Sequence, residues 1–224
     1  MSRSAGKACD TVGVTEHKFL EDSYVERTDE ETRAHYEAWA HTYDQELQEN
    51  GYSTPANAMK ALELFELDRD AEILDVGCGT GLFGRQLWDA GFMTIDGCDY
   101  SPAMLDQARE TGMYRRLFEA NLNQPPMRVN GFPVAGNRYG AAAVVGAFSF
   151  GHVEAAALDE VARVVEPGGA IVIGLNDTFW MEGSLNARID DMIAEGTIEK
   201  VDVQPGDHLP GTGLSGWFIS LRVK

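Results

Sequence analysis

The sequence Ile-Leu-Asp-Val-Gly-Cys-Gly-Thr-Gly-Leu-Phe-Gly at residues 73–84 decides the fold of this chain. Its first four residues predict a buried strand. The alternating glycines that follow let the backbone turn sharply and approach a ligand without an intervening Cβ atom. Leu82, Phe83 and Leu87 then place apolar side chains on one face of a predicted helix. A strand that passes through such a turn into a helix indicates an α/β fold that binds a nucleotide-like cofactor.

The glycine turn alone leaves the identity of the cofactor open. Gly79, Gly81 and Gly84 match the Gly-x-Gly-x-x-Gly pattern of dinucleotide dehydrogenases. Asp75, however, stands at the end of the predicted strand, where a carboxylate is costly unless it is paired or directed at a ligand. It suits a positively charged group better than a pyrophosphate. Asp99 follows at the spacing where a nucleotide-binding fold places an acceptor for a ribose, and its alternative role is that of a residue at a helix start.

The stretch Asp75-Val76-Gly77-Cys78-Gly79-Thr80-Gly81 resembles motif I of the class I S-adenosylmethionine-dependent methyltransferases, a loop that surrounds the methionine part of the cofactor. Residues 96–105 resemble the end of the second strand and the next helix of that family. The resemblance implies that Asp99 binds the ribose hydroxyls. Residues 119–123 resemble the end of the third strand, where Asn121 replaces an acidic residue that accepts a hydrogen bond from the adenine amino group. An amide oxygen accepts such a bond without charge assistance.

The resemblance implies S-adenosylmethionine as the cofactor and a single set of residues around it. This expected cofactor site comprises Tyr36, Tyr43, Asp75, Gly77, Cys78, Gly79, Gly81, Asp99, Tyr100, Met104, Asn121 and Leu122. Tyr36 and Tyr43 are equally explained as members of a core stripe, and Trp39 between them is expected in the core. Cys78 is expected to serve as a small, packable residue of the turn. The family's acidic residue before the fourth strand is absent from the sequence at 139–142, so no role of that carboxylate is transferred.

The rest of the chain predicts strands and helices in alternation, which favours a doubly wound, mainly parallel sheet. We expect an α/β, Rossmann-like, seven-stranded sheet with an N-terminal helical cap. The expected strands after the third are 141–147, 170–175, 199–203 and 217–223, and the expected helices between them are 153–165 and 183–195. A turn is expected at 166–169. The segment 124–140 is an irregular insert, with a hairpin tip at Asn130-Gly131.

The segment before residue 70 predicts a roof for the cofactor site. Thr28 and Glu31 form a capping box, after which aromatic residues recur at helical spacing as far as Leu47. A second helix is expected to begin with Thr54 as its cap and Pro55 in its first turn. Residues 1–24 predict a mobile arm able to order over the site. We therefore expect one domain over 1–224, with arm and cap over 1–70 and the cofactor-binding core over 71–224.

Composition limits the classes of partner. The chain of 224 residues has 18 basic and 36 acidic residues, a formal charge of −18. A nucleic-acid-binding protein normally carries a basic surface, so nucleic acid is not an expected partner. No membrane-length apolar run and no secretory signal are found, so we expect a cytoplasmic protein without a membrane partner. Three cysteines without metal-ligand spacing fit a reducing compartment and predict no metal site.

We expect a methyltransferase that acts on a small-molecule acceptor, of unknown oligomeric state. Polar residues after the predicted strands are candidates for the acceptor site, and His152 is the candidate general base. The others are Asn176, Asp177, Trp180 and His208, of which His208 falls in a predicted lid loop at 204–216. Phe179 and Trp180 could shape an apolar pocket. The alternatives are a noncatalytic protein that binds S-adenosylmethionine or a partner, and an NAD-dependent dehydrogenase, for which too little chain follows the fifth strand.

Overall fold

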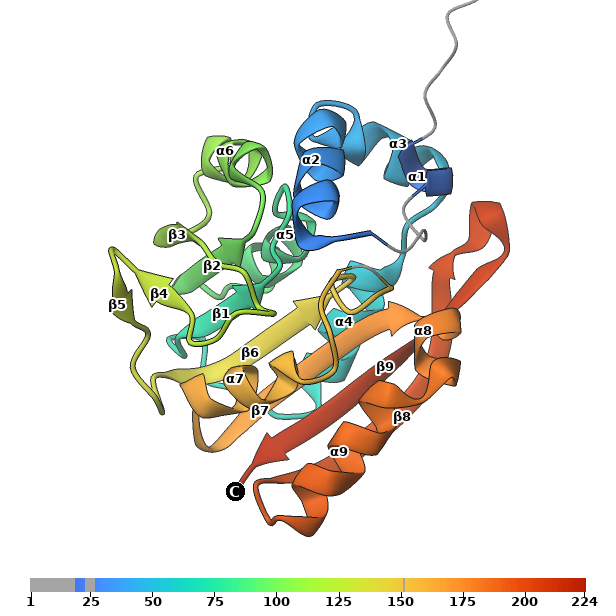
Figure 1. The fold of residues 1–224 in the computed structure, drawn as a ribbon. Coiled ribbons are helices and arrows are strands. Elements are labelled where there is room, and N and C mark those ends of the chain that lie inside the picture. Colours follow the sequence, from blue (N-terminus) through green and yellow to red (C-terminus); the bar gives the residue numbers. More distant parts are fainter. Residues whose placement is uncertain (1–18, 23–26, 151) are drawn as a thin grey trace, which may run out of the picture.

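Seven strands form one mixed sheet in the computed structural model, which describes residues 19–22, 27–150 and 152–224. Their order across the sheet is β3-β2-β1-β6-β7-β9-β8 (Figure 1). The strands are β1 (Ile73–Val76), β2 (Ile95–Asp99), β3 (Arg116–Glu119), β6 (Tyr139–Val145), β7 (Val165–Asn176), β8 (Ile198–Leu209) and β9 (Leu214–Val223). All neighbours from β3 to β7 are parallel, and β9 is antiparallel to β7 and β8. The predicted doubly wound, seven-stranded sheet is confirmed.

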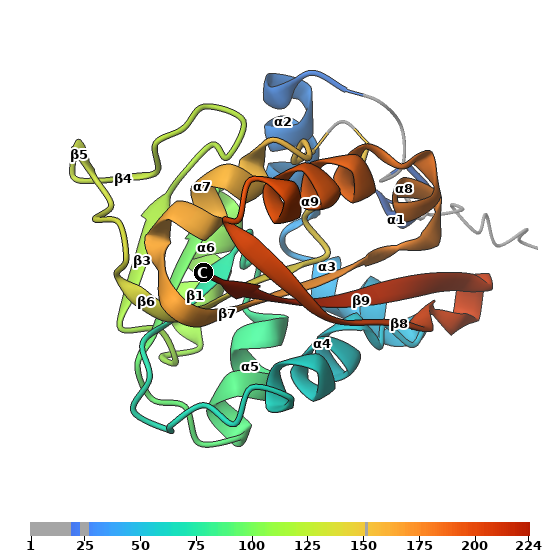
Figure 2. The same ribbon diagram turned by 90° about the horizontal axis from the view of Figure 1, so that it is seen from below.

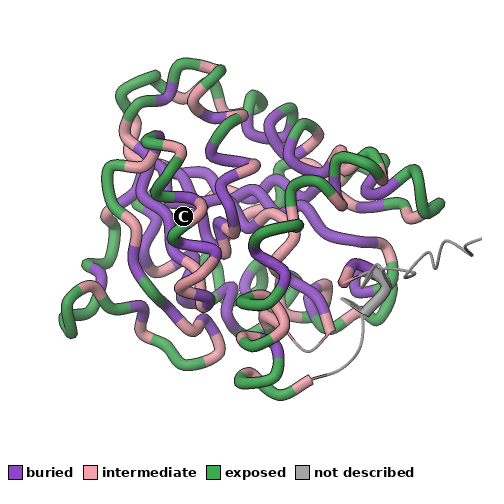
Figure 3. Tube along the Cα trace, turned by 90° about the horizontal axis from the view of Figure 1, so that it is seen from above, coloured by how far each residue is buried: buried purple, intermediate pink, exposed green. Residues whose placement is uncertain are grey.

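Helices cover both faces of the sheet (Figure 2). The helices α4 (Thr54–Glu63) and α5 (Leu82–Asp89) lie on one face, and α7 (Ala157–Val164) and α9 (Ser184–Ala194) lie on the other. The helix α6 (Pro102–Glu110) packs against β2 and β3. Successive strand residues point to opposite faces, so Ile73 packs with α4 and α5 whereas Leu74 packs toward α7. Both faces are covered, and the inner strands are therefore buried along most of their length (Figure 3).

The cap differs in detail from the prediction. The capping box is present, since the Thr28 hydroxyl accepts a hydrogen bond from the Glu31 amide at 3.3 Å and the Glu31 carboxylate accepts one from the Thr28 amide at 3.0 Å. The expected first helix is broken at residues 40–42 into α2 (Asp29–Trp39) and α3 (Tyr43–Glu49). Ser53, not Thr54, occupies the N-cap of α4. Part of the predicted arm, residues 1–18, 23 and 24, lies outside the described residues, and 19–22 form the short helix α1.

The predicted lid at 204–216 is wrong, because β8 and β9 continue through it as one long hairpin. Gln204 pairs with Phe218 and Leu209 with Leu214. Pro205 and Gly206 suggested a loop, but β8 is the outermost strand, where a proline leaves no sheet hydrogen bond unmade. The strands thus exceed their predicted bounds, and His208 lies within β8.

Three elements in the middle of the chain also have other bounds than predicted. β6 begins at Tyr139 and ends at Val145, two residues earlier than predicted at each end. The expected turn at 166–169 is included in β7, with an irregular register opposite Gly140. Helix α7 begins only at Ala157, so the described residues 146–150 and 152–156 precede it outside the named helices and strands. Two short elements follow the predicted pattern, β4 (Arg128–Val129) and β5 (Phe132–Pro133), which confirm the hairpin at Asn130-Gly131.

The C-terminal half adds two elements that were not predicted. The helix α8 (Asp177–Glu182) follows β7 directly, and the 3-10 turn η1 (Pro210–Thr212) joins β8 to β9. None of the helices in the described part of the chain is both long and apolar enough to span a bilayer.

Candidate active site

A cavity opens at the carboxyl ends of the parallel strands, under the cap. It encloses about 720 Å³, including its opening to solvent. The loop after β1 supplies Gly77 and Gly79 to its wall, and α2 and α3 supply Tyr36 and Tyr43. The same edge of the sheet carries the ligand sites of open α/β folds. We call this space the main cavity.

The glycines of the turn differ in their steric surroundings. Gly77 (φ 67°) and Gly79 (φ 54°) both have left-handed backbones that favour glycine. A Cβ on Gly77 would lie 2.6 Å from the Cβ of Ala147, so this glycine lets two loops approach each other. No described atom lies within 4 Å of a Cβ built on Gly79, which faces open space. Gly81 (φ 101°) begins α5 and lies against the Tyr114 ring, away from the main cavity.

Asp99 ends β2 and lines the main cavity. Its Oδ2 accepts a hydrogen bond from the Gly79 amide at 2.9 Å, and its Oδ1 accepts one from the Ser101 amide at 2.9 Å. Burial raises the pKa of this carboxyl, and the backbone donors, Ser101 first, act against that rise. Ser101 caps α6 with its own hydroxyl, which accepts from the Met104 amide. Asp99 therefore has no capping task and faces the cavity.

The wall opposite the glycine turn comes from residues after β2 and β3. Tyr100, Met104, Asn121 and Leu122, which the sequence predicts as cofactor-binding residues, all line the main cavity. Asn121 is partly used inside the protein, because its Oδ1 accepts from the Asn123 amide at 3.0 Å. Its amide nitrogen donates to Asp29 Oδ2 at 2.7 Å. The amide group is thereby held in one orientation.

The cap is attached to the core on both sides of the cavity. Asn123 Nδ2 donates to Asp29 Oδ1 at 3.0 Å, next to the Asn121 bond. On the other side, the Thr80 hydroxyl donates to Asp44 Oδ1 at 2.6 Å, which joins the glycine turn to α3. Arg33 of α2 adds an ion pair with Glu119 at 2.7 Å. These contacts fix α2 and α3 over the cavity.

Three predicted cofactor residues do not line the main cavity. Asp75 and Cys78 border a smaller cavity beneath the turn, and Gly81 borders neither. The Tyr114 hydroxyl donates to Asp75 Oδ2 at 2.7 Å. Burial raises the pKa of Asp75 to about 7, and the Tyr114 hydrogen bond opposes that rise. Burial also raises the pKa of the Cys78 thiol, which keeps it protonated. The direct role of Asp75 toward a cation stays a prediction.

His152 lies in the loop between β6 and α7, at the border of the main cavity. Its Nδ1 lies 3.4 Å from the Tyr36 hydroxyl oxygen, and the two rings meet edge to face. Burial, with smaller contributions from His35 and Arg27, lowers its pKa to about 4. The imidazole is therefore neutral at pH 7.

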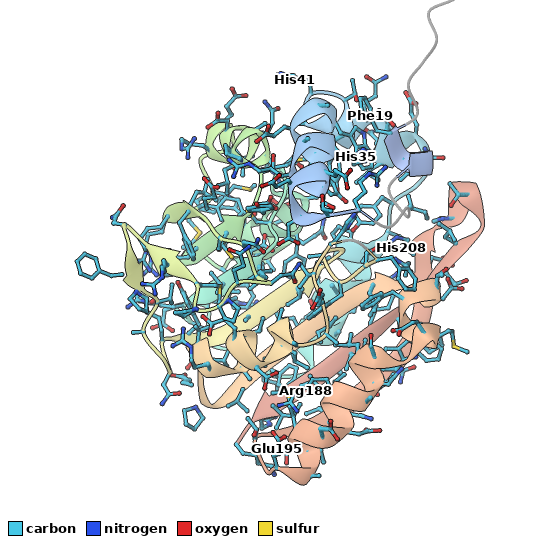
Figure 4. All side chains as sticks on the ribbon, viewed as in Figure 1. Phe19, His35, His41, Arg188, Glu195 and His208 are labelled. Carbon is cyan, nitrogen blue, oxygen red and sulfur yellow. The ribbon has the colours of Figure 1, made fainter. Side chains whose placement is uncertain are left out.

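Three of the other acceptor-site candidates make contacts within the protein, and two of these, Asn176 and His208, also border a smaller cavity beside the main cavity. Asn176 Oδ1 accepts from the Phe179 amide at 2.9 Å and caps α8. Trp180 is buried and stacks on Trp217. His208 is buried in β8, where its Nδ1 lies 2.7 Å from the Thr54 hydroxyl oxygen (Figure 4). Asp177 stands in the first turn of α8 and does not line the main cavity. Trp39 is 1% exposed, which confirms it as core.

Sequence reasoning missed Asp29, Asn123 and Gly146, all of which line the main cavity. No local sequence pattern marks Asp29, because its partners lie about 90 residues away in the chain. Gly146 has a left-handed backbone, and a Cβ there would lie 2.5 Å from the Tyr52 hydroxyl oxygen. Its position directly after the fourth strand of the parallel sheet, β6, is the sequence signal that could have identified Gly146 as a cavity residue.

Known proteins share both the sequence pattern and the fold. A family described as "Methyltransferase domain" matches residues 73–169. The chain is 34% identical over 179 residues to human methyltransferase-like protein 27, covering 78% of this chain and 71% of that protein. It is 52% identical over 56 residues to the 18S rRNA (guanine-N(7))-methyltransferase of Bos taurus, covering 23% of this chain and 20% of that protein.

A solved structure with the same fold is the TehB-like SAM-dependent methyltransferase from Corynebacterium glutamicum, with a TM-score of 0.61 and 20% identity. The match covers 85% of this chain and 99% of that one. The glycine turn, the Asp99 wall and the match to the human relative agree, and the chain belongs to the class I S-adenosylmethionine-dependent methyltransferases.

Proposed function

We propose that this enzyme transfers the methyl group of S-adenosylmethionine to a small-molecule acceptor. The observation that carries the proposal is the attachment of the cap to the core on both sides of the main cavity, through Asp29 and Asp44. A cavity roofed in this way admits a small molecule more readily than a folded macromolecule. The formal charge of −18 also disfavours a polyanionic acceptor such as RNA.

In this proposal the core over 71–224 holds the cofactor, and the residues around the main cavity divide the task. Asp99 accepts hydrogen bonds from the ribose hydroxyls, and Asn121 binds the adenine edge. Gly77 and Gly79 admit the methionine chain, with Tyr36 and Tyr43 above it. Bound S-adenosylmethionine supplies a sulfonium methyl group that is transferred by in-line displacement. The chain itself contributes positioning and the exclusion of water, which are the main requirements of such a reaction.

We assign to His152 the role of accepting the proton of the acceptor's nucleophilic group. A buried, neutral imidazole accepts a hydrogen bond from a nucleophile, and its place at the cavity border brings it near the acceptor. Replacement of His152 by Gln should lower turnover and leave the affinity for S-adenosylhomocysteine unchanged.

Calorimetric titration with S-adenosylmethionine and S-adenosylhomocysteine, with NADH as the competing ligand, tests the cofactor half of the proposal. We expect both adenosyl ligands to bind at micromolar level and NADH not to bind. A panel of small hydroxyl, amine and thiol compounds, followed by release of S-adenosylhomocysteine, tests the acceptor half. Methylation of ribosomal RNA with no turnover on the panel would refute the small-molecule acceptor.

A further inference from the structure

A second cavity lies beside the main cavity, between the cap and the loop after β6. We call it the inner cavity. It encloses about 370 Å³, including its opening, and shares Tyr36, Tyr43, Gly146 and His152 with the main cavity. A third, outer groove is bordered by Ser149 and His152. Among the described residues, His152 alone borders all three spaces. A molecule in the inner cavity would therefore be adjacent to the cofactor.

Three polar side-chain atoms of residues that line the inner cavity are buried and have no hydrogen-bond partner among the described residues. They are Trp39 Nε1, Ser149 Oγ and His152 Nε2. Trp39 is 1% exposed and Ser149 is 5% exposed. Buried polar groups in native proteins are nearly always paired, and an unpaired group is costly. Three such groups around one space indicate that a polar ligand completes them.

The chemistry of these atoms limits the ligand. An indole N–H only donates, so the ligand must carry a hydrogen-bond acceptor. A serine hydroxyl donates or accepts. His152 accepts at Nε2 when its Nδ1 carries the proton and donates toward the Tyr36 oxygen. A hydroxyl group accepts through its oxygen and donates its proton, so it offers both functions that these atoms require.

The described lining of the inner cavity has no charged side chain that could pair with a charged ligand. No Asp, Glu, Lys or Arg is among the described residues that line it. Its two histidines are neutral at pH 7, since burial lowers the pKa of both His152 and His208 to about 4. An ammonium, carboxylate or phosphate group would be desolvated there without a counter-charge.

The remaining wall is aromatic and aliphatic. Trp39 and Tyr43 meet edge to face at 4.6 Å between ring centroids, and Tyr52 meets His208 in the same way at 5.4 Å. Leu47 and Leu209 are both buried beside them. Such walls suit a flat, apolar ring.

We infer that the inner cavity is the acceptor site and that it takes an uncharged compound with a phenolic or enolic hydroxyl group. The inference rests on the proposed function. The acceptor oxygen forms the new bond to the methyl carbon, while the electron pair of the breaking sulfur–carbon bond goes to sulfur. The hydroxyl proton goes to His152 Nε2 and from there to solvent. The products are the methyl ether and S-adenosylhomocysteine.

Three small probes of similar size test this assignment: phenol, benzoate and benzylammonium. Each is titrated by NMR at pH 7.5 into the ¹⁵N-labelled protein saturated with S-adenosylhomocysteine. We expect phenol to bind in the millimolar range and to shift the Trp39 indole N–H signal, assigned with Trp39→Phe. The charged probes should bind at least tenfold more weakly.

Variants separate the inner cavity from other phenol sites. Ser149→Leu should fill the cavity and weaken phenol binding at least tenfold, and Ser149→Ala should weaken it several-fold. Both should keep the wild-type affinity for S-adenosylhomocysteine, as should the control Ser215→Ala, which alters an exposed serine of β9. If Ser149→Leu fails to fold, Ser149→Ala and Trp39→Phe provide the comparison.

The outcomes distinguish the two proposals. Normal binding of S-adenosylhomocysteine, with no preference for phenol or no response at Trp39 and Ser149, overturns the acceptor assignment alone. Failure of the wild-type protein to bind S-adenosylhomocysteine overturns the proposed function, and the acceptor assignment with it.

Discussion

Asp99 and Gly79 are joined by a 2.9 Å hydrogen bond from the Gly79 amide to Asp99 Oδ2. This bond holds the glycine turn of β1 against the end of β2. The two segments are neighbours because β1 and β2 are paired in parallel, with Val76 opposite Cys98. The proposed cofactor site thus depends on a contact between the two most motif-like stretches of the chain.

Asp99→Ala should weaken S-adenosylhomocysteine binding about 10- to 150-fold. The loss corresponds to about 1.5–3 kcal/mol, a usual value for hydrogen bonds to a charged group. Calorimetry on the folded variant measures it, with Asp106→Ala on the exposed face of α6 as the control. Wild-type affinity in folded Asp99→Ala would remove the ribose assignment.

The two glycines of the turn should respond differently to alanine. Gly79→Ala should fold, at a cost of about 1–2 kcal/mol for the left-handed backbone, and should lose cofactor binding because the methyl group enters open space of the main cavity. Gly77→Ala should lose more stability, since its Cβ overlaps Ala147. Urea unfolding and calorimetry on both variants check this. Equal stability of the two variants would contradict it.

The hydrogen bond between Thr80 and Asp44 should stabilise the packing of the cap on the core. Asp44→Asn and Thr80→Val each remove the charge-assisted bond, so we expect faster proteolysis within residues 27–50 and several-fold weaker cofactor binding. The double variant should be no worse than either single variant, because both remove one interaction. Glu49→Gln, on an exposed position of α3, is the control. Additive losses would show that the two residues act separately.

His208 should make the folded state sensitive to acid. Burial lowers its pKa from 6.5 to about 4, so between these values the unfolded chain binds a proton that the folded chain does not. The free energy of unfolding therefore falls as the pH drops from 6.5 to 4, by up to about 3 kcal/mol for this residue, and does not change above 6.5 on its account.

His208→Gln should reduce this acid sensitivity, and His41→Gln at an exposed position serves as the control substitution. His152 titrates in the same direction and keeps part of the effect. Asp75 has the opposite effect on the free energy of unfolding. Its pKa in the folded chain is raised to about 7, so as the pH falls from 7 toward 4 the folded chain binds a proton that the unfolded chain does not, and the folded state gains stability. The measured quantity is therefore the difference between variant and wild type in urea unfolding at pH 7.5 and 4.5. An identical pH dependence for His208→Gln and wild type would contradict the assignment.

Local patterns predicted most of the described structure up to residue 145 well. The strand at 73–76 and the capping box at Thr28 both depend on residues within four positions of one another. The long hairpin of β8 and β9 was missed because it depends on the position of β8 in the sheet, which local patterns do not show. Pro205 and Gly206 read locally as a loop, and only the outer position of β8 in the sheet makes them compatible with a strand.

The sequence by itself determined the family, the cofactor and the doubly wound, seven-stranded fold, because glycine turns, helix caps and apolar periodicity act over short distances. Tertiary structure decided which polar groups meet. Asp29 reaches Asn121, Asp44 reaches Thr80, and Trp39, Ser149 and His152 surround one cavity. These residues are far apart in the chain, and packing of the cap on the sheet is what removes them from water and brings them together.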